Sequence, residues 1–300
     1  MMEANEEVDV VIIGGSYAGL SAALALGRAL RQVVVLDSGQ PCNRQTPHSH
    51  NFLTQDGSSP AALAAVARTQ VLAYPTVQLR SEVAVAATAV GAAFVVTTAG
   101  GAVLRARKLL FATGIRDLMP ALPGFAECWG ISAIHCPYCH GYEYRGQPTG
   151  ILASGDAAVE MGLLIRNWTD TLTIFTNGPA TLQPVQRQQL ATRGIALDET
   201  PVRQLRHQAG QLTHLGLADG RELPLAALYA RLPFEQHCAL PRHLGCAHSE
   251  AGYLVVDNMQ QTSVPGIYAA GDATTPMRAV SAAVAAGTLA GAALNRDLLW

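Results

Sequence analysis

The chain has 300 residues, of which 49% are hydrophobic, and its 20 basic and 22 acidic side chains give a formal net charge of −2. At roughly 150 residues per domain, this length suffices for about two domains with ordinary buried cores. The charges are spread along the chain, which argues against binding to nucleic acid or to an anionic membrane surface. Small, neutral molecules remain possible as binding partners.

The chain opens with MMEANEEVDV, which is acidic and polar where a secretory signal would have a basic start and an apolar run. This predicts a cytoplasmic, reducing location, where six cysteines do not form a disulfide framework and a close pair is catalytic or metal-binding. Residues 83–104 carry no charge and are long enough for a membrane helix. Gly91, Gly100 and Gly101 interrupt that stretch, which predicts a β-meander instead.

The first elements follow a strand, turn, helix, strand order. Residues 8–30 predict a buried strand, a turn at Gly14 and Gly15, and an alanine-rich helix from about Ala18. The segment QVVVLDSG predicts a second buried strand that ends at Asp37, so the chain opens with a βαβ unit. A helix over 59–72 follows, with Ser59 as its N-cap and Pro60 at its first position. A meander over 76–108 then leads to KLLFATG.

The same order recurs later. Residues 148–168 predict strand, glycine turn and helix, 171–177 a second strand, and 212–225 a hairpin that turns at Asp219 and Gly220. GYLVVDN, VPGIYAAGD and a helix over 278–294 come last and complete the first domain. We therefore predict an α/β fold of two doubly wound Rossmann-like domains, in which a second domain of residues 116–240 is inserted into a first domain formed by residues 1–115 and 241–300.

GGSYAG, at residues 14–19, has the form of the dinucleotide fingerprint G-x-G-x-x-G with Ser16 at the second glycine. A diphosphate would lie at the helix N-terminus, where free N–H groups and the helix dipole favour negative charge. Asp37 lies at about the expected distance, about 20 residues further on, for a carboxylate that holds a ribose hydroxyl. An ordinary glycine turn is the alternative, but the complete order of strand, loop, helix, strand and acid favours nucleotide binding.

Two further segments, LFATG at 110–114 and IYAAGD at 267–272, place small residues directly after buried strands. Small side chains there let backbone lie against a flat ligand. With the fingerprint and a C-x-x-C, in this order, they make nearly the whole chain resemble the low-molecular-weight thioredoxin reductases, which are two-domain flavoproteins and homodimers. This resemblance implies that the first domain binds FAD and that the second is an NAD(P)-binding-like domain that carries the C-x-x-C.

The resemblance also implies residues for the FAD site. Asp272 would bind the ribityl chain, and the helix that starts near Arg278 would direct its positive end at the flavin's pyrimidine side, where it stabilises reduced, anionic flavin. The full set of implied cofactor-binding residues comprises Gly14, Gly15, Ser16, Ala18, Gly19, Asp37, Ser38, Asn43, His48, Asn51, Ala112, Thr113, Gly114, Gly271, Asp272, Arg278, Ala279 and Val280.

HCPYCHGYE, at residues 135–143, fits four chemistries: haem attachment, half of a zinc site, a structural disulfide, or a redox dithiol. Haem at C-x-x-C-H needs export machinery, and a disulfide across two residues closes too small a loop to add much stability. A zinc site needs two ligands in addition to Cys136 and Cys139. The remaining cysteines do not form a second C-x-x-C; they are Cys42, Cys128, Cys238 and Cys246. We therefore expect a redox dithiol, Cys136 and Cys139, and no metal.

By the resemblance, Cys139 faces the flavin and Cys136 exchanges with the substrate, a small dithiol or disulfide or a thioredoxin-like protein. A thiolate is the reactive form, and His140 is placed to move its proton in both directions. Thioredoxin reductases carry an acid at that position. C-x-x-C-H is similar to the flavin-dependent dithiol oxidases of gliotoxin- and holomycin-type natural products, which pass electrons to oxygen.

The second domain departs from the resemblance where NADPH would bind. Ala153 stands at the tight-turn glycine, and the next strand ends in Thr176 and Asn177 where basic residues would bind the 2′-phosphate. We therefore expect a degenerate NADPH site. The use of NAD(P)H as electron donor is doubtful, and a protein donor such as a ferredoxin is an alternative. Three accounts follow: a reductase, an oxygen-using dithiol oxidase, and a redox sensor that is not an enzyme.

Three residues outside these motifs also carry expectations. Trp300 would either cover the flavin or fray, and His50, like His48, would either lie near the flavin or be a surface or hydrogen-bonding histidine. Cys42 is expected to be a small buried residue.

Overall fold

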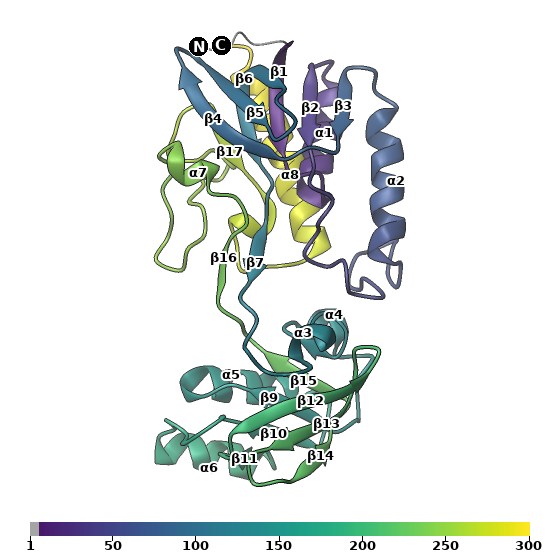
Figure 1. The fold of residues 1–300 in the computed structure, drawn as a ribbon, viewed down its shortest axis with the longest axis vertical. Coiled ribbons are helices and arrows are strands. Elements are labelled where there is room, and N and C mark those ends of the chain that lie inside the picture. Colours follow the sequence, from purple (N-terminus) through teal and green to yellow (C-terminus); the bar gives the residue numbers. More distant parts are fainter. Residues whose placement is uncertain (1–5) are drawn as a thin grey trace. The chain divides into compact units, whose positions relative to one another are not determined.

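The computed structural model describes residues 6–300, which divide into two compact units (Figure 1). Residues 1–5, the start of the acidic opening segment and of the expected first domain, lie outside the described residues. Unit 1 runs up to Arg44 and also contains Asn51–Arg116 and Phe234–Trp300. Unit 2 contains Gln45–His50 and Asp117–Pro233. Each unit is an α/β structure built on a parallel sheet.

Two boundaries of these units differ from the sequence-based ones. The chain returns to unit 1 at Phe234, before residue 241, and the strand that begins there, β16 (Phe234–Gln236), pairs with β7 (Ile115–Asp117). The segment Gln45–His50 belongs to unit 2. Both differences depend on contacts between segments far apart in the chain, which periodicity does not reveal.

Unit 1 contains a seven-stranded sheet within the described residues, in the order β3-β2-β1-β6-β5-β4, with β17 also paired to β6. Its parallel strands are β1 (Glu6–Ile13), β2 (Val33–Leu36), β3 (Val77–Arg80), β6 (Val103–Phe111) and β17 (Ile267–Ala269). The strands β4 (Ala84–Val90) and β5 (Ala93–Thr98) are antiparallel. The predicted β-meander is thereby confirmed. The helices are α1 (Tyr17–Arg28), α2 (Pro60–Leu72), α7 (Leu240–His243) and α8 (Val280–Asp297), with a 3₁₀ turn, η1 (Gly271–Ala273).

The strands and helices of unit 1 follow from their residues. The central strands β1 and β2 have runs of buried valine and isoleucine, as expected for parallel strands covered on both faces. Helices α1 and α8 pack against each other through small residues, since a Cβ on Gly287 would lie 2.1 Å from the carbonyl oxygen of Ala18. Ser59 caps α2 as predicted, and its hydroxyl accepts a hydrogen bond from Ala62 N at 3.2 Å.

Unit 2 contains a five-stranded sheet among the described residues, in the order β11-β10-β9-β15-β8, and a three-stranded antiparallel sheet, β12-β13-β14. The first comprises β8 (Ala133–Ile134), β9 (Thr149–Leu152), β10 (Leu172–Phe175), β11 (Ala196–Asp198) and β15 (Ala227–Ala230). The second comprises β12 (Val202–Gln208), β13 (Gln211–Leu217) and β14 (Glu222–Pro224). The helices are α3 (Phe125–Cys128), α4 (Pro137–His140), α5 (Gly155–Ile165) and α6 (Pro184–Thr192). The hairpin turn at Asp219 and Gly220 is confirmed.

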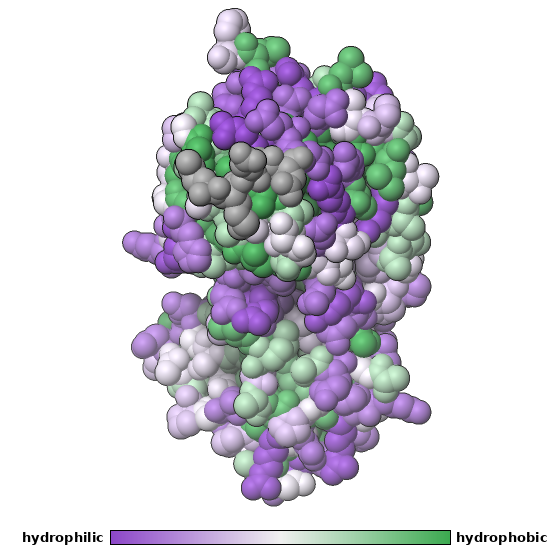
Figure 2. All heavy atoms as spheres, turned by 45° about the horizontal axis from the view of Figure 1, so that its top comes forward, coloured by the Kyte–Doolittle hydropathy of each residue, from purple (hydrophilic) through white to green (hydrophobic). Residues whose placement is uncertain are grey.

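The surface mixes charged and apolar residues. Figure 2 shows hydrophilic and hydrophobic residues interspersed over the face that it presents. Within residues 6–300, no helix combines the length and the apolar character needed to cross a bilayer. Residues 252–258, expected to form an element of the first domain, contribute isolated bridges rather than a strand.

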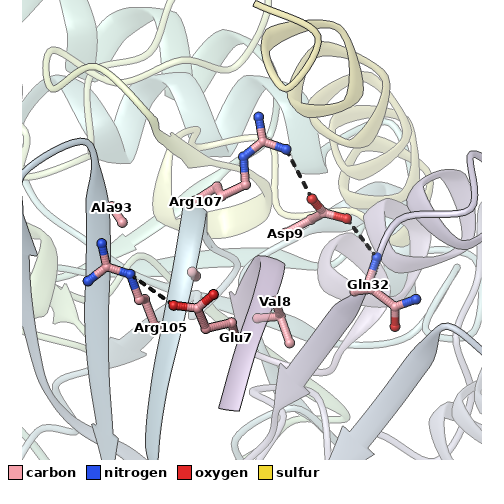
Figure 3. Close-up of a pocket in the computed structure, with 8 residues that line it drawn as sticks. Glu7, Val8, Asp9, Gln32, Ala93, Arg105 and Arg107 are labelled. Carbon is pink, nitrogen blue, oxygen red and sulfur yellow. Dashed lines mark hydrogen bonds and ion pairs between the residues drawn. The ribbon is translucent and has the colours of Figure 1, made fainter. Parts of the chain in front are cut away.

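The C-terminus lies at the amino edge of the unit 1 sheet, where a shallow hollow of about 250 Å³ opens (Figure 3). Its charges are paired, Arg105 with Glu7 at 3.3 Å and Arg107 with Asp9 at 3.2 Å. Arg107 also donates to the carbonyl oxygen of Leu298, just past the end of α8. Trp300 is 99% exposed and lies at the opposite end of α8 from the glycine turns, so it does not approach them within its own chain.

Candidate functional site

The carboxyl edge of the unit 1 sheet brings together the three small-residue turns found in the sequence. Gly14 has φ +109°, and a Cβ there would lie 2.2 Å from the carbonyl oxygen of Ala112, which begins the second turn. Gly271, in the third turn, has φ +80°, and its Cβ would lie 3.0 Å from the Cβ of Ala18. Only glycine meets both constraints at Gly14. The backbone segments therefore converge on one edge.

The helix N-termini at this edge offer backbone donors. Ser16 caps α1 and Ala279 caps α8, and neither helix start has a side-chain hydrogen bond to its free N–H groups. The hydroxyl of Thr113 is buried and has no hydrogen-bond partner among the described residues. Free N–H groups, an unsatisfied buried hydroxyl and closely apposed backbone are what a dinucleotide with a diphosphate requires. The residues of this edge therefore fit FAD.

Asp37 lies directly after β2, as the fingerprint requires. Its Oδ1 accepts a hydrogen bond from Gly39 N at 3.2 Å, and its Oδ2 pairs with the guanidinium of Arg68 on α2. A Cβ on Gly15 would lie 2.7 Å from the Asp37 Cβ, so the turn and the acid are in contact. Arg68 could not be identified from the sequence, because one arginine on an otherwise ordinary helix gives no signal. The neighbouring Ser38 is exposed.

Asp272 lies in η1 and faces two other side chains of unit 1. Its Oδ2 is 3.8 Å from Arg278 Nε and 3.7 Å from Cys42 Sγ. Cys42 is exposed, so the expectation of a buried residue there is wrong. It follows β2 in a loop whose next residue, Asn43, donates to the hydroxyl of Tyr17 at 3.3 Å. This loop therefore reaches the edge where the turns converge.

The remaining implied cofactor residues divide between the units. Asn51 lies in unit 1 in the left-handed region, φ +60°, and its N–H donates to Asp56 at 2.7 Å. His48 belongs to unit 2, and its ring centre lies 6.4 Å from that of His50. All of the implied cofactor residues except His48 are thus in unit 1.

The dithiol lies in unit 2 on α4, which follows the buried strand β8. Cys136 is the N-cap residue, Pro137 takes the first helical position, and the sulfur atoms of Cys136 and Cys139 lie 2.6 Å apart. The N–H of His140 donates to the carbonyl oxygen of Cys136 at 3.3 Å. One helical turn therefore holds the pair and the adjacent imidazole together.

Burial dominates the protonation of His140. It lowers the pKa of His140 to about 4, while the nearby carboxylate of Glu143 acts to raise it and His50 acts to lower it. At neutral pH the imidazole is uncharged, so it can accept a thiol proton. Glu143 and His50, whose side chains lie 3.5 Å apart, were missed as a pair because they are far apart in the sequence.

Aromatic residues surround the dithiol. The rings of Tyr138 and Trp168 meet edge to face at 5.7 Å, and a Cβ on Gly141 would lie 3.0 Å from the Trp168 indole nitrogen. Tyr229, on β15, pairs in register with Ile134 on β8 and is 1% exposed. Burial raises the pKa of Tyr229, and the cysteine pair acts in the same direction, so its hydroxyl stays protonated beside the dithiol.

Three further cysteines are less reactive than an exposed thiol. Burial raises the pKa of the thiols of Cys128, Cys238 and Cys246, which keeps them protonated at neutral pH. Across residues 6–300, no group of three or more His, Cys, Asp or Glu side chains is arranged to hold a metal ion.

The residues after β10, where the 2′-phosphate of NADPH would need cations, make contacts within unit 2 instead. Thr176 Oγ1 donates to the carbonyl oxygen of Gly178 at 2.5 Å, and Asn177 Oδ1 accepts from Val202 N at 2.7 Å. The next arginine, Arg187, is paired with Glu199 at 2.6 Å. These side chains are thus occupied within the unit.

A dinucleotide-type edge in one α/β unit and a cysteine pair beside a histidine in a second define a two-domain disulfide oxidoreductase. The chain belongs to the pyridine nucleotide-disulphide oxidoreductase family, whose model matches residues 8–287. It is a flavoprotein disulfide oxidoreductase of the thioredoxin reductase type. The recognised resemblance, the fold class and the enzyme class are confirmed.

Individual proteins support the same assignment. "Thioredoxin reductase aclD" of Aspergillus oryzae is 34% identical over 307 residues, which cover 97% of this chain and 96% of that protein. The crystal structure of an oxidoreductase from Agrobacterium tumefaciens is 39% identical, covers 98% of this chain and 99% of its own, and has a TM-score of 0.92. The structure of HlmI is 34% identical, with 98% and 93% covered and a TM-score of 0.92.

Proposed function

We propose that this enzyme exchanges two electrons between a substrate and FAD through the Cys136–Cys139 pair, with His140 as the proton-transfer group. The observation that carries the proposal is the 2.6 Å separation of the two sulfur atoms beside an imidazole that is uncharged at neutral pH. In unit 1, Asp37, the glycine turns and Asp272 would hold FAD, which supplies a two-electron acceptor and donor when bound.

The exchange itself is carried by the cysteines. With the pair as a disulfide, a substrate thiolate attacks Cys136, the Cys136–Cys139 bond breaks, and a mixed disulfide forms. The second thiolate of the substrate attacks the substrate sulfur of this mixed disulfide and releases Cys136. The substrate is thereby oxidised by two electrons, and the cysteine pair is reduced. His140 accepts a proton from one substrate thiol at a time and passes it to the cysteine thiolate that is released, so that the two protons end on Cys136 and Cys139. The same steps in reverse reduce a substrate disulfide.

A second candidate, an oxygen-dependent dithiol oxidase that forms disulfides in small molecules, is favoured by the contacts in unit 2. Because Thr176 and Asn177 are engaged with backbone groups and Arg187 with Glu199, they leave the 2′-phosphate of NADPH without cations. Electrons would then enter from the dithiol and leave to oxygen as hydrogen peroxide. The sensor account is not proposed, since the family consists of enzymes.

The test is anaerobic mixing of the oxidised holoenzyme with a small dithiol, with flavin absorbance followed in time. Bleaching that air reverses, with one peroxide formed per dithiol oxidised, supports the oxidase. Bleaching by dithiol without oxygen-dependent recovery supports exchange with another acceptor. If neither a dithiol nor a reduced thioredoxin bleaches the flavin, the proposed role of the cysteine pair is wrong.

We further propose a cytoplasmic homodimer. The resemblance to thioredoxin reductases supports the dimer, and a close cysteine pair of the redox type in place of a disulfide framework supports the reducing location. Light scattering of the purified holoenzyme and cell fractionation test these two statements separately.

A further inference from the structure

The carboxylate of Glu143 is close to two histidines of unit 2, His140 and His50. We propose that Glu143 is a positioning residue for His140, that His50 anchors its carboxylate, and that this carboxylate stabilises the imidazolium formed when His140 takes a proton from Cys139. The inference rests on the proposed function of the cysteine pair and adds two residues to that site.

Local geometry places Glu143 beside His140. Gly141 continues the helical conformation of α4, with φ −65° and ψ −32°, and its N–H donates to the carbonyl oxygen of Pro137 at 2.7 Å. Helical backbone therefore extends through Gly141, and a turn follows it. Glu143 follows in the turn after α4, close enough for its carboxylate to act electrostatically on the imidazole of His140.

A segment far away in the sequence, Gln45–His50, also contacts the Glu143 carboxylate. Gln45–His50 packs within unit 2, where Gln45 donates to the carbonyl oxygen of Ala126 at 3.4 Å and Ser49 is buried. His50 Nε2 then lies 3.5 Å from Glu143 Oε1, with the side chains 21% and 38% exposed. The contact is partly removed from water, which distinguishes it from a pair on the open surface.

The other titratable groups near His140 do not substitute for Glu143. Tyr144 and Tyr229 are neutral at physiological pH, because burial raises the pKa of Tyr144 to about 12 and that of Tyr229 further. His50 and burial both oppose a charged imidazole, and Glu143 favours it. The remaining titratable or charged neighbours along the two segments are His48, Cys136, Tyr138, Cys139, Tyr142 and Arg145. The guanidinium of Arg145 lies 3.9 Å from the ring centre of Tyr142.

The proton step is balanced and involves no oxidation. The S–H bond of Cys139 breaks, an N–H bond forms on the imidazole of His140, and a thiolate and an imidazolium result. The Glu143 carboxylate lowers the energy of that pair relative to the neutral one, as the third member of a nucleophile, base and orienting acid does. Its effect is therefore a lower apparent pKa of the Cys139 thiol.

The test uses the full-length holoenzyme with Cys136→Ser, in which alkylation of Cys139 by iodoacetamide is followed by mass spectrometry of its peptide. Glu143→Gln should raise the midpoint of the pH profile by about one unit, so that alkylation below the midpoint slows about tenfold while the high-pH plateau is unchanged. Glu143→Asp should retain part of the effect. Glu160→Gln, which breaks an ion pair with Arg231 elsewhere in unit 2, is the matched control and should leave the profile unchanged.

His50 supplies an independent arm. His50→Ala should raise the midpoint by less than Glu143→Gln, and His50→Gln, which keeps a donor to the carboxylate, should restore it. An unchanged midpoint in Glu143→Gln, or an equal shift in the Glu160→Gln control, overturns the proposal. A downward shift in His50→Ala overturns the anchoring role. Alkylation needs no turnover, so failure of flavin bleaching by dithiols with the shift intact would refute the proposed function alone.

Discussion

The side-chain oxygen of Asn177 accepts a hydrogen bond from the backbone N–H of Val202, 2.7 Å away, and so joins the end of β10 to the start of β12. Asn177 lies in the left-handed region, φ +55°, which asparagine tolerates better than most residues. The position that would present a cation to a 2′-phosphate thus has a structural role. This makes the second domain's use of NADPH the first property to test.

NADPH should be a poor reductant of the bound flavin. Loss of one charge-assisted hydrogen bond to a phosphate costs roughly 1.5 to 3 kcal/mol, and at about 1.4 kcal/mol per tenfold each lost contact weakens binding by an order of magnitude or more. The measurement is anaerobic titration with NADPH and, as a control for the 2′-phosphate, with NADH. Rapid bleaching at micromolar NADPH would show that the unit 2 turn works as a cofactor site.

FAD should copurify with the protein and depend on Asp37. The carboxylate follows β2 in contact with the glycine turn, and its removal takes away hydrogen bonds to a charged acceptor worth about 1.5 to 3 kcal/mol each. Asp37→Ala should therefore raise the dissociation constant of FAD at least about tenfold, measured by flavin fluorescence on reconstitution of the apoprotein. Asp170→Ala, which breaks an exposed ion pair with Arg166 in unit 2, is the control. Equal FAD affinity in both variants would remove Asp37 from the site.

The two cysteines should give different single variants. From the resemblance we expect Cys139 to face the flavin, so Cys136→Ser should leave a thiolate there and show a long-wavelength absorbance band, whereas Cys139→Ser should not. Both should abolish dithiol oxidation, because the exchange needs two sulfurs. A band that appears only in Cys139→Ser would mean that the two roles are reversed.

Much of this site could be predicted from sequence because its parts are contiguous. The turn at Gly14 and the C-x-x-C carry their constraints within a few residues, and small residues after buried strands indicate where strands end. The pairing of Arg68 with Asp37 and that of His50 with Glu143 could not be found in this way, since each pair meets only through the fold. Burial, which decides the protonation of His140, is likewise a property of packing.

The free energy of unfolding should depend on pH through His140. Its pKa is lowered from 6.5 to about 4 by burial, so between these values the unfolded chain binds a proton that the folded protein does not. His140 therefore does not lower the free energy of unfolding above about pH 6.5. As the pH falls toward 4, it lowers that free energy by up to about 1.4 kcal/mol per pH unit.

His140→Asn removes this titration and isolates it from the carboxylates that titrate in the same range. The difference in unfolding free energy between wild type and variant, measured by urea denaturation, should be constant above about pH 6.5 and should change in favour of the variant at lower pH. The same variant should slow dithiol oxidation about 10²- to 10⁴-fold near neutral pH, as expected when a general base is lost. A difference curve that is flat down to pH 4, together with unchanged turnover, would show that His140 neither titrates with folding nor moves the thiol proton.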